Sequence, residues 1–134
     1  SGDAFGATVA MSANIVVVGA PKDDTAGTDK GAIYVFNKTT GALLRTITNT
    51  DPGILTTSAG AGFPGSLAIS GDNILAGVAY YTDGVGDPFI PPVVDTYGYK
   101  NGVVYAYSAS TGALLKTIKN DQPLYEEYFG RNLS

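Results

Sequence analysis

Few residues of this sequence are of the types that carry out catalysis. The 134 residues include no His and no Cys, which removes the commonest general base, the thiolate nucleophile and the commonest zinc ligands. Glu126 and Glu127 resemble a carboxylate pair for glycoside hydrolysis. Adjacent residues of a strand point to opposite faces, so the pair is poorly placed to flank one bond, and a solvated linker is the favoured interpretation. We therefore expect no catalytic residues and a protein that is not an enzyme.

The composition is that of a globular chain that buries a core, with 44% hydrophobic and 15% charged residues. Eight basic and twelve acidic residues give a net charge of −4, and the basic residues are scattered, so we predict no nucleic-acid partner. The longest apolar stretch, residues 15–20, is far shorter than the roughly 20 residues of a membrane span. We predict no membrane insertion, while the absence of Cys leaves the compartment open.

A repeat of four apolar blocks organises the chain. Phe5 begins the first block, Phe63 begins it again 58 residues later, and Phe129 begins it a third time 66 residues after that. The blocks are rich in Val, Ile, Leu, Tyr and Phe and are bounded by Gly, Asn, Asp or Pro, which is typical of strands. The first unit has its blocks at residues 5–12, 14–20, 31–36 and 40–47, and the second at residues 63–70, 73–79, 102–107 and 111–118.

Local patterns indicate how these strands pair. Residues 37–41 and 108–112 are typical of hairpin turns, with Gly41 at a positive φ, so the third and fourth blocks are predicted to pair antiparallel. The second block is almost continuously apolar, as in a strand buried on both faces, and the fourth alternates like an outer strand. The second blocks are aligned with Asn14 matched to Asn73.

Four antiparallel strands per unit predict an all-β fold of propeller-type blades, which bury their faces only against neighbouring blades. The predicted organisation is a first repeat at residues 1–53, a second at 54–123 with an inserted loop at 81–100, and the first strand of a third at 124–134. A β-sandwich is the alternative, and it predicts no third start. Propellers have about four to eight blades, so we expect the chain to be part of a longer propeller or to assemble with its own copies.

The first unit contains, in order, Phe5-Gly6, Val-Val-Gly-Ala-Pro at 17–21, Asp-Asp at 23–24 and Gly-Ala-Ile-Tyr-Val-Phe at 31–36. These motifs resemble the FG-GAP repeat, which is named after its Phe-Gly and Gly-Ala-Pro signatures and occurs in the propellers of integrin α-subunits. Thr-Thr-Gly-Ala-Leu-Leu at 39–44, followed by Asn and Pro, is similar to repeats of exported bacterial proteins and of structural proteins of aquatic tailed phages. The second unit departs from the signatures, with Pro64 in place of the Gly.

The resemblance implies a structural or binding module that is extracellular, on a cell surface or on a virion. Its partners would be protein, in neighbouring repeats or copies of itself, or glycan. A self-polymerising filament subunit is the alternative, because repeats that join head to tail without closing a ring form filaments. A quinone-dependent dehydrogenase is less favoured: Thr-Gly-Ala-Leu-Leu is similar to repeats of those propellers too, but their docking positions call for Trp, and the chain has none.

Integrin-type repeats often carry a calcium loop, because this hard cation takes about six to eight oxygen ligands on a tight turn. The corresponding loop here offers Asp23, Asp24 and Asp29, although not in the Asp-x-Asp-x-Asp-Gly spacing. A solvated turn is the favoured alternative. No other cofactor is expected.

The insertion in the second unit is the predicted partner-binding segment. Aromatic and proline-rich loops on a rigid scaffold make good contacts, because Tyr buries a large area at little entropic cost. The alternative is that the loop covers the edge of its own blade. Asn37, in an Asn-Lys-Thr tripeptide at a hairpin tip, is a candidate glycosylation site. The candidate contact residues are Tyr81, Phe89, Ile90, Pro91, Pro92, Val93, Tyr97 and Tyr99.

Overall fold

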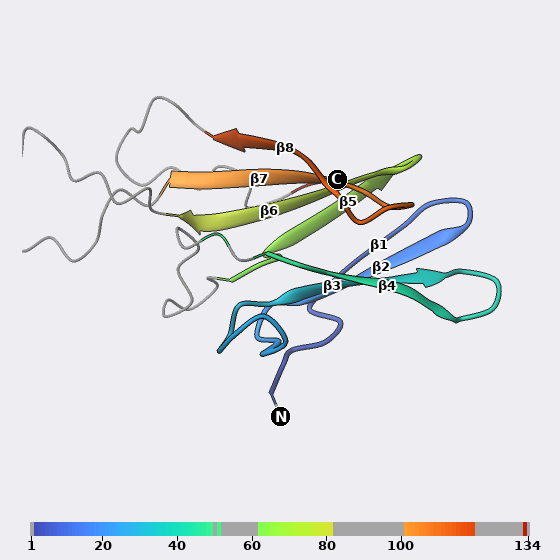
Figure 1. The fold of residues 1–134 in the computed structure, drawn as a ribbon, viewed down its shortest axis with the longest axis horizontal. Coiled ribbons are helices and arrows are strands. Elements are labelled where there is room, and N and C mark those ends of the chain that lie inside the picture. The colour runs from blue at the N-terminus through green and yellow to red at the C-terminus, as the bar shows by residue number, and fades with distance from the viewer. Residues whose placement is uncertain (1, 50, 52–61, 82–100, 120–132, 134) are drawn as a thin grey trace, which may run out of the picture.

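The computed structural model describes residues 2–49, 51, 62–81, 101–119 and 133, which form two four-stranded antiparallel sheets (Figure 1). Neighbouring strands follow chain order in both sheets. No helix occurs in these residues, so the predicted all-β class with two four-stranded antiparallel sheets is confirmed. The first sheet contains β1 (Thr8–Met11), β2 (Ile15–Ala20), β3 (Ala32–Asn37) and β4 (Leu43–Thr48), and the second contains β5 (Ser66–Ser70), β6 (Asn73–Tyr81), β7 (Asn101–Ser108) and β8 (Leu114–Lys119).

The predicted division of the chain is only partly covered by the described residues. The first sheet lies within residues 8–48 and the second within residues 66–119. The predicted repeat boundaries at residues 53 and 123 lie outside the described residues, as does the predicted third repeat apart from Leu133.

The hairpins and outer strands form as the sequence predicts. β3 pairs antiparallel with β4, and β7 with β8. Gly41 has a φ of 71° in the first hairpin, and Gly112 has a φ of 75° in the second, a left-handed conformation that glycine adopts without a Cβ penalty. β4 and β8 lie at sheet edges, and β8 is exposed along its whole length. The last four residues of β2 are buried, as a nearly continuous apolar strand predicts.

Strand register identifies which residues of the two repeats are equivalent. Thr8 lies opposite Gly19 in the first sheet, and Ser66 lies opposite Gly77 in the second. Both positions recur after 58 residues, so β1 and β2 correspond to β5 and β6 with this constant spacing.

The sequence alignment of the second block was wrong by one residue. With the spacing of 58, Asn14 corresponds to Asp72 and not to Asn73. The error arose because both Asn residues lie next to the turn between the first two strands, where Asn is common on either side. Side-chain alternation sets the register in a sheet, and a shift of one residue would move every side chain to the other face.

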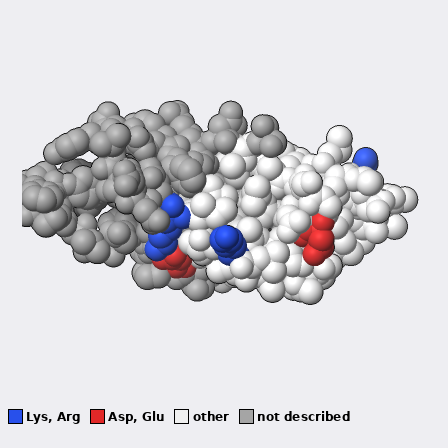
Figure 2. Space-filling model, turned by 90° about the horizontal axis from the view of Figure 1, so that it is seen from above, with Lys and Arg blue, Asp and Glu red and all other residues white. Residues whose placement is uncertain are grey.

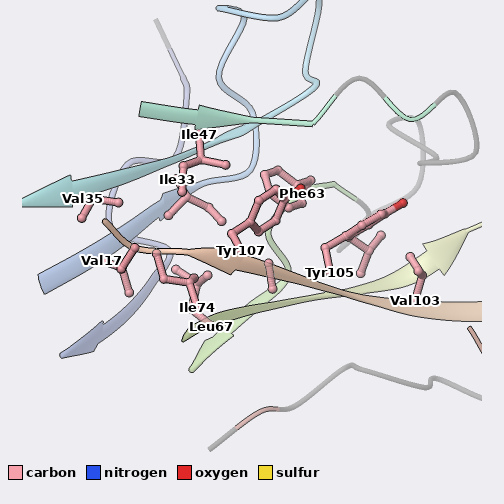
Figure 3. Packing of buried hydrophobic residues seen from close by; sticks show 13 residues of the cluster. Val17, Ile33, Val35, Ile47, Phe63, Leu67, Ile74, Val103, Tyr105 and Tyr107 are labelled. Atoms are coloured by element: carbon pink, nitrogen blue, oxygen red, sulfur yellow. The ribbon is translucent and has the colours of Figure 1, made fainter. Parts of the chain in front are cut away.

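The core lies between the two sheets (Figure 3). One face of the first sheet contributes Val17, Ile33, Val35 and Ile47, which are between 0% and 4% exposed. Between the sheets, β5 contacts β1 and β2. Face-to-face packing of two antiparallel sheets is common to propeller blades and β-sandwiches. The largest core side chains of the second repeat are Phe63, Leu67, Ile74, Val78, Val103, Tyr105 and Tyr107.

Candidate binding surface and the junction between repeats

The loop between β2 and β3 holds the three predicted calcium ligands. Asp23 is buried; its Oδ1 accepts a hydrogen bond from the backbone N–H of Thr25 at 2.8 Å, and its Oδ2 accepts one from the Tyr34 hydroxyl. Oδ1 of Asp24 accepts from the backbone N–H of Asp29 at 2.8 Å. No group of three or more Asp, Glu, His or Cys side chains in the described part of the chain is placed to hold a metal ion. The geometry assigns Asp23 and Asp24 to loop structure, and calcium binding stays a prediction.

Asp23 and Tyr34 form a charge-assisted hydrogen bond. Burial raises the pKa of Asp23, but the hydrogen bonds from Thr25 and Tyr34 outweigh it and leave that pKa below its usual value. The hydrogen bond to Asp23 raises the pKa of Tyr34 in turn, and burial adds to this. At neutral pH the carboxylate is therefore the ionised acceptor and the phenol the neutral donor, which is a stronger arrangement than a neutral pair.

The same loop is packed against the start of the second repeat. Gly31, just before β3, has a φ of +78°, and its N–H donates to the backbone oxygen of Asp23 at 2.9 Å. A Cβ on Gly31 would overlap the carbonyl oxygen of Phe63 and lie 2.7 Å from the Phe63 carbonyl carbon. Only a glycine allows the two backbones to approach this closely. The loop thus belongs to the junction between the repeats.

Three aromatic rings cluster on the face of the first sheet that points away from the second sheet. The centroid of Phe5 lies 5.4 Å from that of Tyr34 and 6.3 Å from that of Phe36, and Tyr34 and Phe36 are 6.5 Å apart. The N-terminal segment that carries Phe5 lies on this side of the sheet (Figure 1). Phe5 is 60% exposed, and beside it on β1 Val9 and Met11 are 59% and 67% exposed. We call Phe5, Val9, Met11, Tyr34 and Phe36 the open face.

The second repeat carries the same aromatic cluster in a buried position. The centroid of Phe63 lies 6.0 Å from that of Tyr105 and 5.8 Å from that of Tyr107, and the two tyrosines are 6.4 Å apart. All three side chains are at most 3% exposed. In Figure 3 the rings of Phe63 and Tyr107 lie on the side that faces Ile33 and Ile47 of the first sheet.

The register shows that the two clusters occupy equivalent positions. Tyr34 lies opposite Val18, and Tyr105 lies opposite Ala76, the residue 58 positions after Val18. Tyr34 and Tyr105 are therefore equivalent, and Phe36 is equivalent to Tyr107 by the same spacing of 71. The first sheet covers the second with its opposite face, the one that carries Val17, Ile33, Val35 and Ile47. We call the face that carries Val17, Ile33, Val35 and Ile47 the front of the first repeat, and the face that carries the aromatic cluster the back of each repeat. The front of the first repeat thus packs against the back of the second.

Two hydrogen bonds connect the two repeats at the end of β4. The side-chain amide of Asn49 donates to the hydroxyl of Tyr107 at 2.9 Å, and the hydroxyl of Tyr105 donates to Oδ2 of Asp51 at 2.8 Å. Burial raises the pKa of Tyr107 well above its usual value, so the phenol stays neutral. Sequence reasoning missed these roles. The signal was the Asn-x-Asp at residues 49–51, of which only the Asn was noted above, as part of a family motif.

Residues 1–36 match the family model described as FG-GAP repeat. This first segment is similar to an FG-GAP repeat. The match covers Phe5, β1, β2 and most of β3, and with them the loop that holds Asp23. No curated protein matches the chain. The bacterial and phage sub-form stays a prediction.

The FG-GAP repeat supports the coarser functional prediction. These repeats form propeller-like binding or structural modules, are generally non-catalytic and typically occur in extracellular proteins. None of residues 2–49, 51, 62–81, 101–119 and 133 forms a helix that is long and apolar enough to cross a membrane. On the face shown in Figure 2, blue and red side chains are few; one blue and one red group lie side by side, and the others are separated by uncharged surface.

Most of the predicted contact residues lie where the structure gives no description. Tyr81 ends β6, whereas Phe89, Ile90, Pro91, Pro92, Val93, Tyr97 and Tyr99 lie outside the described residues, as do Glu126 and Glu127. Their predicted role stays untested.

Asn37, the candidate glycosylation site, ends β3 and is half-buried. Its Oδ1 accepts hydrogen bonds from the backbone N–H groups of Thr39 and Thr40, at 2.9 and 3.0 Å. Such a side-chain contact to the following backbone shapes a turn. Glycosylation of Asn37 stays a prediction.

Proposed function

We propose that the chain is a non-catalytic structural or binding module of a propeller-like assembly, extracellular or on a virion. One observation carries the proposal: the repeats pack front to back and leave an apolar back face open. The face of the second repeat that holds Phe63, Tyr105 and Tyr107 is covered by the first repeat, while the equivalent face with Phe5 and Phe36 is uncovered.

This pattern favours propeller-type blades over a closed sandwich. In a sandwich, each sheet turns its apolar face inward and presents polar residues outward along each strand. In the first sheet both faces are apolar: Val17 and Val35 fill the core, and Val9 and Met11 point outward. A repeat with two apolar faces needs a neighbour on each side, which is the condition that stacked blades meet.

Partners of the module would be proteins first, in neighbouring repeats or copies of the chain. An apolar face of adjacent aromatic and aliphatic side chains suits another apolar surface, since burial of such area drives association. If the partner is a glycan, the tyrosine-rich insertion from Tyr81 to Tyr99 would bind it. Assembly into filaments is the second candidate, and it follows from the same front-to-back packing if the rotation does not close a ring.

Location tests the proposal directly. An antibody raised against the purified chain should label the outside of intact source cells, or virions, in immunogold electron microscopy. Labelling confined to the cytoplasm of sectioned cells would contradict the extracellular or virion assignment.

A deletion tests the partner contact. Deletion of residues 84–92 should weaken binding to extracellular material more than it lowers the melting temperature. A large loss of melting temperature with unchanged binding would show that the insertion only covers its own blade.

A further inference from the structure

The second repeat has a counterpart of the face with which the first repeat covers it, and this counterpart is partly exposed. By the spacing of 71, Ile118 is equivalent to Ile47, and both lie on the fourth strand of their sheets. Ile47 is 4% exposed inside the junction, whereas Ile118 is 40% exposed. Leu75 and Ala106, the equivalents of Val17 and Val35, are half-buried on the same face, where Val104 is buried. We call Leu75, Ala106 and Ile118 the outer face of the second sheet.

We propose that the open face of the first sheet binds the outer face of the second sheet in another copy of this chain, so that copies associate head to tail. The inference rests on the proposed structural function and names the partner of its open face. Each copy would use one face of each kind, which makes the contact heterologous and the product a ring or a filament.

The junction inside the chain shows that these two kinds of face fit. There the aromatic cluster of Phe63, Tyr105 and Tyr107 receives Val17, Ile33, Val35 and Ile47 (Figure 3). The open cluster has nearly the same geometry, with ring separations of 5.4 to 6.5 Å against 5.8 to 6.4 Å. A surface equivalent to one that already binds its partner within the chain is a suitable receptor for a second copy of that partner.

The polar groups of the open face do not oppose this contact. In the internal junction the Tyr107 hydroxyl bonds Asn49 of the covering repeat. Its equivalent on the open face is Phe36, which has no hydroxyl to satisfy, and the Tyr34 hydroxyl already donates to Asp23 within its own repeat. The open face can therefore be covered by an apolar surface without leaving a buried phenol unpaired, which would cost about 1–3 kcal/mol.

Sedimentation velocity of the purified chain, from about 1 to 200 µM, tests the contact. The wild type should form dimers and larger species as concentration rises. Val9→Lys combined with Met11→Lys places charges on the open face, and Ile118→Lys places one on the outer face, so each variant should stay monomeric. Thr40→Lys, at an exposed hairpin tip, adds the same charge away from both faces and should associate like the wild type. Far-ultraviolet circular dichroism confirms folding, and Met11→Gln replaces the double variant if that fails to fold.

Mixing the two face variants distinguishes head-to-tail docking from other association. The Val9→Lys, Met11→Lys chain keeps an intact outer face, and the Ile118→Lys chain keeps an intact open face. An equimolar mixture should therefore form one junction and give a dimer but nothing larger. The proposal is overturned by a wild type that remains monomeric up to 200 µM, by face variants that associate like the wild type, or by a mixture that stays monomeric.

The outcome is separable from that of the proposed function. If the wild type is monomeric and the protein is found outside the cell, the self-association proposal fails and the proposed binding function stands. If the protein forms head-to-tail dimers and is found only in the cytoplasm, the self-association proposal stands and the proposed extracellular or virion function fails.

Discussion

Replacement of Gly31 by Ala should destabilise the chain far more than the same replacement at Gly41. Both glycines have left-handed backbones, with φ values of +78° and +71°. A Cβ at Gly41 meets nothing within 4 Å, whereas a Cβ at Gly31 overlaps the backbone oxygen of Phe63 at the junction between the repeats. The pair of variants therefore shares the conformational penalty and differs in the steric one.

The magnitudes follow from these two contributions. A left-handed conformation costs an L-residue about 1–2 kcal/mol, and this is the whole expected effect of Gly41→Ala. Gly31→Ala adds about 1–3 kcal/mol for forcing apart well-packed atoms, because the Phe63 backbone cannot rotate away as a flexible side chain can. The total for Gly31→Ala is about 2–5 kcal/mol, so the variants should differ by about 1–3 kcal/mol.

Urea denaturation followed by far-ultraviolet circular dichroism measures the difference. With a slope of about 2 kcal/mol per molar urea, a 2 kcal/mol difference separates the two midpoints by about 1 M. The measurement belongs at low protein concentration, where self-association does not contribute. Equal midpoints for Gly31→Ala and Gly41→Ala would show that the loop does not rest on Phe63, and the packing of the junction described above would be wrong.

Three further predictions address the junction and the acidic loop. Ile47→Ala should lower the free energy of unfolding by about 2–5 kcal/mol, and Ile118→Ala should lower it by less than about 1 kcal/mol in dilute solution, since only Ile47 is buried. Equal losses of unfolding free energy in urea denaturation would contradict front-to-back packing. The pKa of Asp23 is lowered in the folded chain, so the stabilisation of the fold by this carboxylate is complete above the unfolded pKa near 3.8 and is lost as the pH falls through the folded pKa. The unfolding free energy of Asp23→Asn should therefore fall less steeply between pH 5 and 2 than that of the wild type. Parallel curves for the two proteins would refute this. Both Asp23 oxygens already accept hydrogen bonds, so neither calcium nor a chelator should move the melting temperature, and an upward shift with calcium would establish the site predicted from the family.

The sequence was enough for the strands because each one has its own local signal. β-branched and aromatic blocks bounded by turn residues predict the strands, and Gly41 and Gly112 predict the hairpins without any knowledge of the tertiary structure. The alignment of Asn14 with Asn73 failed for a related reason: turn residues mark where a strand ends but not its register, which depends on which face each side chain occupies.

The junction between the repeats was harder to predict, because it depends on contacts between residues far apart in the chain. Asp23 looked like a cation ligand in the sequence, since nothing near it showed that the Tyr34 hydroxyl and the Thr25 N–H would use its oxygens. Asn49 and Tyr107 are 58 residues apart. Periodicity can assign both to strand ends but cannot pair them.

The hydrogen bonds of the two repeats give the junction a direction. The hydroxyl of Tyr34 is bonded within its own repeat, by Asp23. The hydroxyls of Tyr105 and Tyr107 are bonded by Asp51 and Asn49, which belong to the end of the first repeat.

The back face of the second repeat therefore depends on the repeat before it, for polar as well as apolar contacts. The open face of the first repeat depends on a neighbour only for apolar cover, because its equivalent of Tyr107 is Phe36. A buried phenol without a partner is penalised, whereas an exposed apolar ring only forgoes a gain. The sequence difference between the two repeats thus matches a covered face in the second and, in the first, an exposed face that leaves no phenol without a partner.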